Sequence, residues 1–308
     1  MSRIHEALKK AEQERAAIQG GAVQPSYTAT PVAEPSEIGE AAPVLMPPVG
    51  QGGNAMPTFA SPFSLDTLVA RCPQLDWKPD SACMLFLNDS DSGRGTEEFR
   101  TLRSRLYHTR EKMPLKKVLV TSALPKEGKS FTAANLAQVL VRQHGRRVLL
   151  IDADLRGPCL HLMLGTSSGP GLTDYLMGHN DEFSIMQRGP MENLFFIPSG
   201  HDIANPAEAV GNGRLKMLLQ RVEPLFDWII VDSPPAVPVS DASMLAKFCD
   251  GVLMVVRSNV TPADMARRAR QEFPDQALLG VVLNGIGVDA EPYTRYYYER
   301  YEKKGTRA

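Results

Sequence analysis

A lysine and a serine at the start of a helix-forming segment are the residues of this chain best suited to chemistry. The run from Val118 to Asn135 reads VLVTSALPKEGKSFTAAN, in which a short apolar strand leads through a turn to Gly128, Lys129 and Ser130. This is the layout of a phosphate-binding loop, because backbone N–H groups of the loop and of the helix N-terminus surround an anion. Lys129 is expected to reach the β- and γ-phosphates of a nucleotide, and the Ser130 hydroxyl to hold Mg²⁺.

The loop departs from the GxxxxGK[ST] pattern at its first position. Ala123 stands where that pattern has glycine, so the alternative is a strand–turn–helix that contains GKS by chance. The loop residues that we expect at the nucleotide are Pro125, Lys126, Glu127, Gly128, Lys129, Ser130 and Phe131.

Carboxylates follow two further apolar strands. Residues 147–156 read RVLLIDADLR and end in Asp152-x-Asp154-x-Arg156, whereas residues 227–235 read DWIIVDSPP and contain Asp232. In a parallel sheet covered by helices on both faces, strands are continuous apolar runs and ligands bind at their carboxyl ends. The loop, the acidic pair and the third carboxylate are therefore predicted to converge on one Mg²⁺–nucleotide.

The elements that must carry these residues alternate in type, which predicts an α/β fold with a doubly wound, mostly parallel sheet. The helix pattern after the loop runs from Thr132 to Gln143, and another follows Asn205 and continues through Leu219. The expected strands lie at 118–120, 148–151, 228–232, 252–256 and 280–284.

Composition divides the 308 residues into four parts. Residues 1–18 fit a short amphipathic helix, which is marginal alone and is expected to dock on a partner protein or a second subunit. Residues 19–80 are a Pro/Gly/Ala-rich linker that we expect to be largely disordered. Residues 81–290 are predicted to form the nucleotide-binding domain, and residues 291–308 a flexible tyrosine-rich tail.

The tail concentrates the tyrosines of the chain. Five of the eight lie in the final sixteen residues: Tyr293, Tyr296, Tyr297, Tyr298 and Tyr301. A C-terminal helix that packs three of them on the domain is one interpretation. We favour phosphoacceptors, because three adjacent tyrosines point in different directions and a terminal tail is easily fed into an active site.

Several features exclude other classes of protein. The formal net charge of −1 argues against a general nucleic-acid binder, and no run of eighteen apolar residues or signal-peptide pattern is present. The four cysteines have no CxxC spacing, which is typical of reduced thiols in a cytosolic protein.

Three motifs carry a family resemblance. VTSALPKEGKSFTAANLA, VLLIDADLRGPCLH and IIVDSPPAVPVSDA resemble the Walker A, A′ and B motifs of the bacterial tyrosine kinases, the CpsD/CapB family of polysaccharide-biosynthesis autokinases. The resemblance covers roughly residues 95 to 301. It implies a P-loop NTPase that uses ATP and Mg²⁺ to phosphorylate its own tail tyrosines, the tail of one subunit entering the site of the next.

The same resemblance implies roles for the site residues. Ser130 and Asp152 lie at Mg²⁺, and Asp232 holds the metal through water. Asp154 is the candidate that accepts the proton of the attacking tyrosine, whose hydroxyl has an unperturbed pKa of about 10. The catalytic set is thus Lys129, Asp152, Asp154 and Asp232. Arg156 is either a phosphate or interface group or a salt-bridged turn residue, and Asn284 is expected at the base.

Partners follow from the resemblance as well. Glu97, Arg100 and Arg103 match an ExxRxxR element that the family links to self-association in a ring, although such charges are also typical of a solvated helix face. Arg105 stands where the family usually has asparagine. The family further implies a separate membrane chain-length regulator (Wzz-type) as activator and a cognate tyrosine phosphatase. A cytoplasmic protein recruited to the inner face of the plasma membrane is the expectation.

Two other functions stay open. MinD/ParA-type ATPases share the fold, but their signature lysine is replaced here by Leu124, and the tyrosine tail has no place in their function. A nucleotide-binding scaffold with little transfer activity is the second alternative, because Ala123 and Lys126 alter the phosphate loop.

Overall fold

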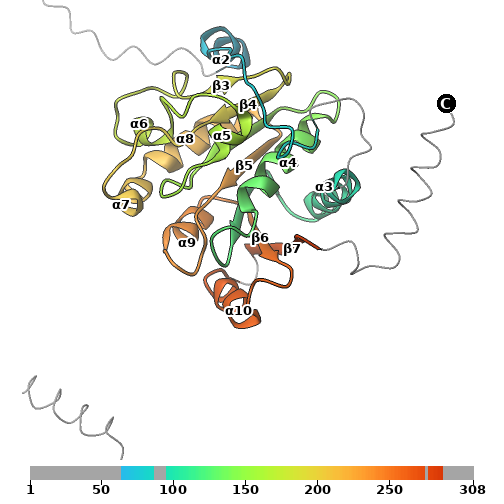
Figure 1. Cartoon of the computed structure of the whole chain (residues 1–308). Coiled ribbons are helices and arrows are strands. Elements are labelled where there is room, and N and C mark those ends of the chain that lie inside the picture. The colour runs from blue at the N-terminus through green and yellow to red at the C-terminus, as the bar shows by residue number, and fades with distance from the viewer. Residues whose placement is uncertain (1–63, 87–94, 275–276, 287–308) are drawn as a thin grey trace, which may run out of the picture. The chain divides into compact units, whose positions relative to one another are not determined.

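The computed structural model describes residues 64–86, 95–274 and 277–286, which contain one seven-stranded sheet (Figure 1). The strand order is β3-β4-β2-β5-β1-β6-β7, and all neighbours are parallel except β3 and β4. The strands are β1 (Lys117–Ser122), β2 (Val148–Asp152), β3 (Gln187–Arg188), β4 (Leu194–Ile197), β5 (Trp228–Asp232), β6 (Gly251–Arg257) and β7 (Leu278–Asn284). The predicted mostly parallel sheet is confirmed, whereas the sequence patterns missed β3 and β4.

Helices connect these strands. They are α2 (Leu65–Arg71), α3 (Thr96–Arg110), α4 (Lys129–Val141), α5 (Leu160–Leu164), α6 (Leu172–Leu176), α7 (Pro206–Gly211), α8 (Arg214–Val222), α9 (Asp241–Ala246) and α10 (Ala263–Gln271), with a 3₁₀ turn at Glu223–Leu225. The helix expected from Asn205 through Leu219 is in fact two, because Gly213 adopts φ +85° and interrupts it. Within the described ranges, no helix is both long and apolar enough to span a membrane.

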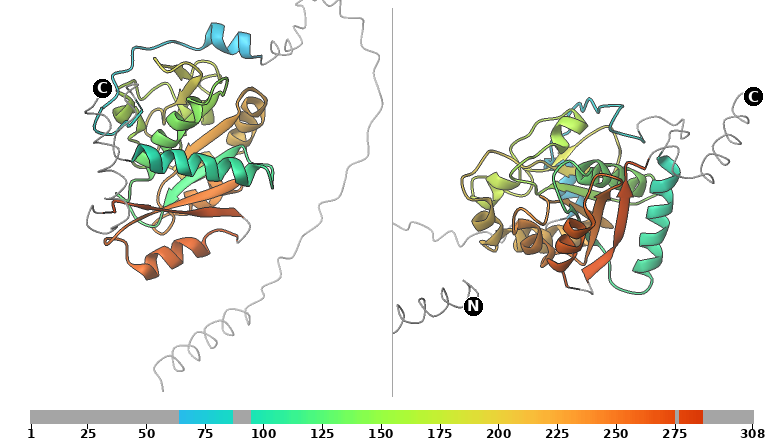
Figure 2. Two further views of the ribbon diagram at one scale, coloured as in Figure 1. Left: turned by 90° about the vertical axis from the view of Figure 1, so that its right-hand side faces the viewer. Right: turned by 60° about the horizontal axis from the view of Figure 1, so that its bottom comes forward.

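The central strands bury both of their faces. In β1, Leu119 packs into one hydrophobic cluster, whereas Val118 and Val120 pack into the other. Side chains alternate across a strand, so a strand between two helical layers must be apolar throughout. Helices α3 and α4 contribute to one cluster, whereas α6 to α10 contribute to the other; Figure 2 shows α3 alongside the β6–β7 side of the sheet.

Residues 64–80, which lie in the segment predicted to be a linker, pack on the folded domain. Helix α2 covers seven residues of it, and Leu68, Cys72 and Trp77 are buried in the two clusters. The segment also bridges to the sheet edge, because Gln74 pairs with Arg188. These few apolar residues could not be recognised as core residues from the sequence, because the residues around them are mostly polar. The predicted N-terminal helix and the rest of the linker lie outside the described residues.

Asn135 in α4 fastens the end of this segment to the helix that follows the phosphate loop. Its side-chain oxygen accepts a hydrogen bond from Leu85 N at 2.8 Å, and its amide donates to Cys83 O at 2.8 Å and to Phe131 O. Asn135 is fully buried, so its side chain, and not water, satisfies these backbone groups.

We expect Asn135→Ala to lower the free energy of unfolding by about 1 to 3 kcal/mol, because it leaves the half-buried Leu85 N–H and Cys83 carbonyl without this partner. Urea denaturation measures the loss. Asn212→Ala is the matched control, since Asn212 makes similar bonds to Leu176 O and Arg214 N but lies exposed. Equal losses in the two variants would contradict the assignment.

Candidate nucleotide site

The β1–α4 loop has the backbone of an anion-binding turn. Gly128 caps α4 with φ +93° and contributes no side chain, so the first N–H groups of the helix face the loop. Any other residue would be strained at this φ, and its Cβ would collide with the Asn284 side-chain amide. The left-handed conformations fall at Lys126 (φ +66°) and Gly128, not at Ala123. Alanine at the first loop position is therefore compatible with this turn.

Side chains of the loop itself and of neighbouring elements hold the loop in its conformation. Glu127 is buried and accepts a hydrogen bond from Leu124 N at 2.8 Å, while its other oxygen contacts the Thr261 hydroxyl. Arg257, at the end of β6, donates to Lys126 O at 3.1 Å. The Glu127 side chain thus stabilises the loop, and only its backbone remains for a phosphate.

Asn284 contacts the loop, whereas the Phe131 side chain packs on α3. Asn284, at the end of β7, donates from Nδ2 to Glu127 O at 2.9 Å. The Phe131 ring packs against Phe99 of α3, with ring centroids 6.0 Å apart. In this structure the Asn284 amide that we expected at the base of the nucleotide is therefore engaged with the loop backbone.

The two aspartates that end β2 and β5 lie side by side. Asp152 and Asp232 are register partners, and both are completely buried. Asp152 accepts hydrogen bonds from Leu160 N at 3.1 Å and Asp154 N at 3.3 Å. The Ser130 hydroxyl lies near Asp232, yet neither Asp232 oxygen has a hydrogen-bond partner of good geometry. An unpartnered buried carboxylate is costly, so a ligand is its expected partner.

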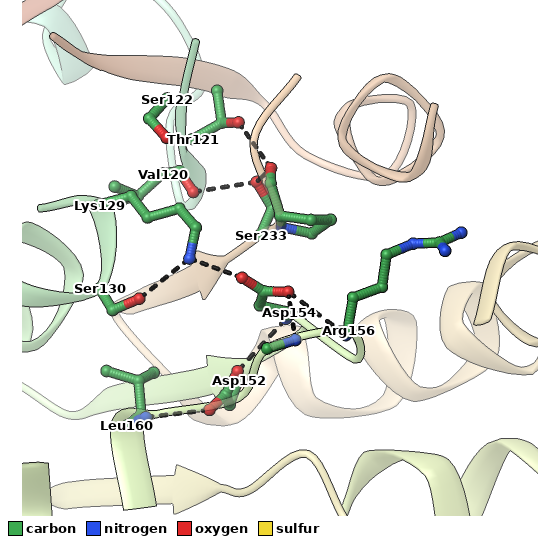
Figure 3. Close-up of polar contacts among 12 residues, drawn as sticks. Val120, Thr121, Ser122, Lys129, Ser130, Asp152, Asp154, Arg156, Leu160 and Ser233 are labelled. Atoms are coloured by element: carbon green, nitrogen blue, oxygen red, sulfur yellow. Dashed lines mark hydrogen bonds and ion pairs between the residues drawn. The ribbon is translucent and has the colours of Figure 1, made fainter. Parts of the chain in front are cut away.

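Lys129 joins the loop to the turn after β2. Its Nζ lies 2.6 Å from Asp154 Oδ2 and 3.2 Å from Ser130 Oγ, and both members of the ion pair are buried (Figure 3). The other Asp154 oxygen accepts hydrogen bonds from Arg156 N and Gly157 N. The predicted convergence of Lys129, Ser130, Asp152 and Asp154 is thus present in the fold.

Burial and mutual repulsion dominate the electrostatics of this cluster. Burial raises the pKa of Asp152, and the neighbouring Asp232 raises it further. Burial also raises the pKa of Asp232, with Lys129 acting in the opposite direction. For Lys129, burial disfavours the ammonium, but Asp232 and Asp154 outweigh it and raise the pKa. One cation faces three carboxylates, so the cluster favours additional positive charge.

The residues present fit Mg²⁺. Its preferred ligands are oxygens, and the free carboxylate oxygens of Asp232 lie buried next to Asp152 and the Ser130 hydroxyl. The part of the chain that the structure describes contains no group of three acidic, histidine or cysteine side chains able to hold a metal alone. This agrees with Mg²⁺ sites that take one or two carboxylates and complete their shell with water and substrate phosphates.

Comparison with known proteins places this geometry in a family. Residues 126–263 match the model of an AAA domain. The chain is 35% identical over 204 residues to the tyrosine-protein kinase YwqD of Bacillus subtilis. The aligned region covers 66% of this chain and 86% of YwqD. The chain belongs to the bacterial tyrosine-protein kinases.

Two further comparisons define the shared part of this tyrosine-protein kinase. It is 32% identical over 208 residues to the tyrosine-protein kinase wzc of Salmonella typhimurium, covering 67% of this chain but only 29% of that longer protein. The solved kinase domain of the Escherichia coli tyrosine kinase ETK is 30% identical, with a TM-score of 0.59, and covers 63% of this chain and 77% of that one. The predicted family and its P-loop fold are confirmed, and the kinase binds a nucleotide.

In this kinase, Leu124 replaces the MinD/ParA signature lysine, and its side chain packs partly buried against the core. Arg156 is a salt-bridged residue: its guanidinium makes a bidentate pair with Asp241, at 2.7 and 3.1 Å, and points away from Lys129 in Figure 3. Sequence reasoning missed the role of Asp241, although it lies in the VSDA end of the third motif.

The residues proposed for self-association lie on α3. Glu97 and Arg100 form an ion pair with each other on this helix. Arg103 instead donates to Val139 O at 3.0 Å, near the end of α4. Arg103 therefore has a role within the subunit, because it satisfies a carbonyl in the last turn of that helix. The predicted tail tyrosines lie outside the described residues.

Proposed function

We propose that this protein is an ATP-dependent tyrosine autokinase that phosphorylates its own tail, Tyr293 to Tyr301, in trans. The main support is the buried Lys129–Asp154 pair beside the unpartnered Asp232, all at the carboxyl edge of the sheet. Phosphoryl transfer requires positioning and charge neutralisation more than covalent participation by the protein. This cluster offers both, together with a carboxylate within reach of the lysine.

Each residue of the cluster has a separate role in the transfer. Lys129 leaves Asp154 and neutralises the γ-phosphoryl group, while the N–H groups at the start of α4 hold the phosphates. Mg²⁺, held by Ser130, Asp152 and Asp232, would supply further charge neutralisation at the phosphates. Asp154, released from Lys129, accepts the tyrosine proton as the bond between the tyrosine oxygen and the γ-phosphorus forms. The bond from that phosphorus to the β–γ bridging oxygen breaks, and ADP departs.

The cellular role that we propose is regulation of polysaccharide assembly or export. A separate membrane chain-length regulator would activate the kinase at the inner face of the plasma membrane, and a cognate tyrosine phosphatase would reset it. Self-association through α3 would bring the tail of one subunit to the site of another. These partners rest on the family resemblance of the three motifs.

Phosphotyrosine detection with mass-spectrometric site mapping tests this function. Purified protein is incubated with Mg²⁺-ATP, with and without membranes from the source cell. Phosphate on Tyr293 to Tyr301 supports the autokinase, and a requirement for membranes supports a separate activator. ATP hydrolysis without phosphotyrosine in both conditions would instead favour a MinD/ParA-type ATPase or a scaffold.

Replacing the five tail tyrosines by phenylalanine is expected to remove most autophosphorylation while ATP affinity stays within about twofold, because the tail is substrate and not part of the nucleotide site. Total phosphotyrosine and binding of a fluorescent ATP analogue measure the two effects. Tyr107→Phe and Tyr175→Phe are the controls, since both rings pack in the core clusters. Label that persists in the five-fold variant would refute the tail as the acceptor.

A further inference from the structure

Asp154 lies beyond the part of the sheet that would hold it in place. β2 ends at Asp152, and Ala153 N makes the next backbone bond, to Asp232 O at 2.9 Å. Among the described residues, Asp154 pairs with Lys129 and otherwise accepts hydrogen bonds from within its own turn, from Arg156 N at 3.3 Å and Gly157 N at 3.1 Å. Bonds inside a turn fix its shape, but once Lys129 leaves Asp154 for a phosphate they do not fix the position of the turn relative to the phosphate loop.

A side-chain contact supplies that position. Arg156 Nε lies 2.7 Å from Asp241 Oδ2, and Nη2 lies 3.1 Å from Oδ1. Asp241 is 2% exposed and is the first residue of α9. The segment between Asp232 and α9 is itself bonded to β1, since Ala236 N donates to Ser122 O at 2.8 Å. The pair therefore ties the Asp154 turn to a segment that is anchored beside the phosphate loop.

We propose that Asp241 is a positioning residue for phosphoryl transfer, acting through Arg156 to hold Asp154 at the reacting groups. This inference rests on the proposed function. A guanidinium that binds a carboxylate through two parallel hydrogen bonds fixes direction as well as distance, which a lysine does not. The Arg156 guanidinium turns away from Lys129, so it acts on the turn and not on a phosphate (Figure 3).

A purely structural ion pair is the alternative, and the chain contains a matched example. Arg221 and Glu182 lie 2.6 Å apart, with side chains 38% and 8% exposed, compared with 42% and 3% for Arg156 and Asp241. Glu182 lies in none of the three site motifs, and its partner Arg221 belongs to α8. If burial of a carboxylate beside an arginine mattered only for stability, Glu182→Gln and Asp241→Asn would have the same effects.

The test compares Asp241→Asn, Arg156→Lys, their double variant and Glu182→Gln in the full chain. We expect Asp241→Asn and Arg156→Lys each to lower kcat of autophosphorylation by about 10- to 100-fold, because misplacing a reacting group by about 1 Å can lower the rate by about 100-fold. The KM for ATP and the affinity for a fluorescent ATP analogue should change by less than about threefold. The double variant should be no slower than the slower single one, because both substitutions break one contact.

Glu182→Gln should lower the melting temperature yet leave kcat within about twofold of wild type. If Asp241→Asn fails to fold, Arg156→Lys carries the test, since its side chain is partly exposed. Folded variants with an unchanged kcat, additive losses in the double variant, or an equal loss in Glu182→Gln would each overturn the proposal. Absence of phosphotyrosine in the wild type would refute the proposed function instead, and kcat of ATP hydrolysis would then decide the role of Asp241.

Discussion

Lys129→Met is expected to reduce phosphotyrosine formation by about a thousandfold or more. It removes the positive charge that lies among three buried carboxylates, which is also the group proposed to neutralise the γ-phosphate. The expectation rests on the 2.6 Å pair between Lys129 and Asp154 at the start of α4. Single-turnover transfer of radiolabelled phosphate measures the loss, and circular dichroism confirms that the variant is folded.

Lys126→Met is the matched control for this substitution. Lys126 lies in the same loop but is exposed, and only its backbone carbonyl has a described partner, Arg257. We expect its activity to stay within about tenfold of wild type. Persistent phosphotyrosine in Lys129→Met would disprove the assigned site. A much larger loss in Lys126→Met than in Lys129→Met would move the phosphate contact to the exposed lysine.

Asp232→Asn is expected to stabilise the nucleotide-free protein by about 1 to 3 kcal/mol at neutral pH, because a buried carboxylate without partners is replaced by a neutral side chain. The same substitution should abolish Mg²⁺-dependent transfer. Urea denaturation in the presence of a chelator measures the stability. Asp174→Asn is the control: Asp174 is also buried, but it accepts from Gly171 N at 2.7 Å and pairs with His201, so the variant should be less stable.

The free energy of unfolding should also depend on pH in different ways in the wild type and in Asp232→Asn. In the native protein, burial raises the pKa of Asp152 and Asp232 above their unfolded values. A raised pKa means that these groups stabilise the fold fully below about pH 4 and lose this contribution as the pH rises toward neutrality. Asp232→Asn should therefore show a shallower decrease than wild type across this range. Identical pH profiles of the free energy of unfolding would contradict the burial of an unpartnered Asp232.

Much of the site could be predicted from the sequence because its parts are local. The phosphate loop lies in consecutive residues, and each acidic motif directly follows an apolar strand. Parallel strands place their carboxyl ends at one edge, so continuous apolar runs were enough to predict that Lys129, Asp152 and Asp232 would meet. The boundary at residue 80 was less predictable, since only a few apolar residues in a polar segment, such as Leu68 and Trp77, anchor it to the core.

The sequence by itself determined the fold class, the phosphate loop and the three carboxylates, because strand period and motif spacing are properties of short segments. Only the tertiary structure decided which remote side chains hold the phosphate loop and the aspartates in position. Arg156 finds Asp241 across 85 residues, and Asn284 reaches Glu127 across 157. Neither residue type nor spacing indicates such a partner, since a salt-bridged arginine and a phosphate-binding arginine have the same sequence pattern. The distinction arises when packing brings remote elements to one edge of the sheet.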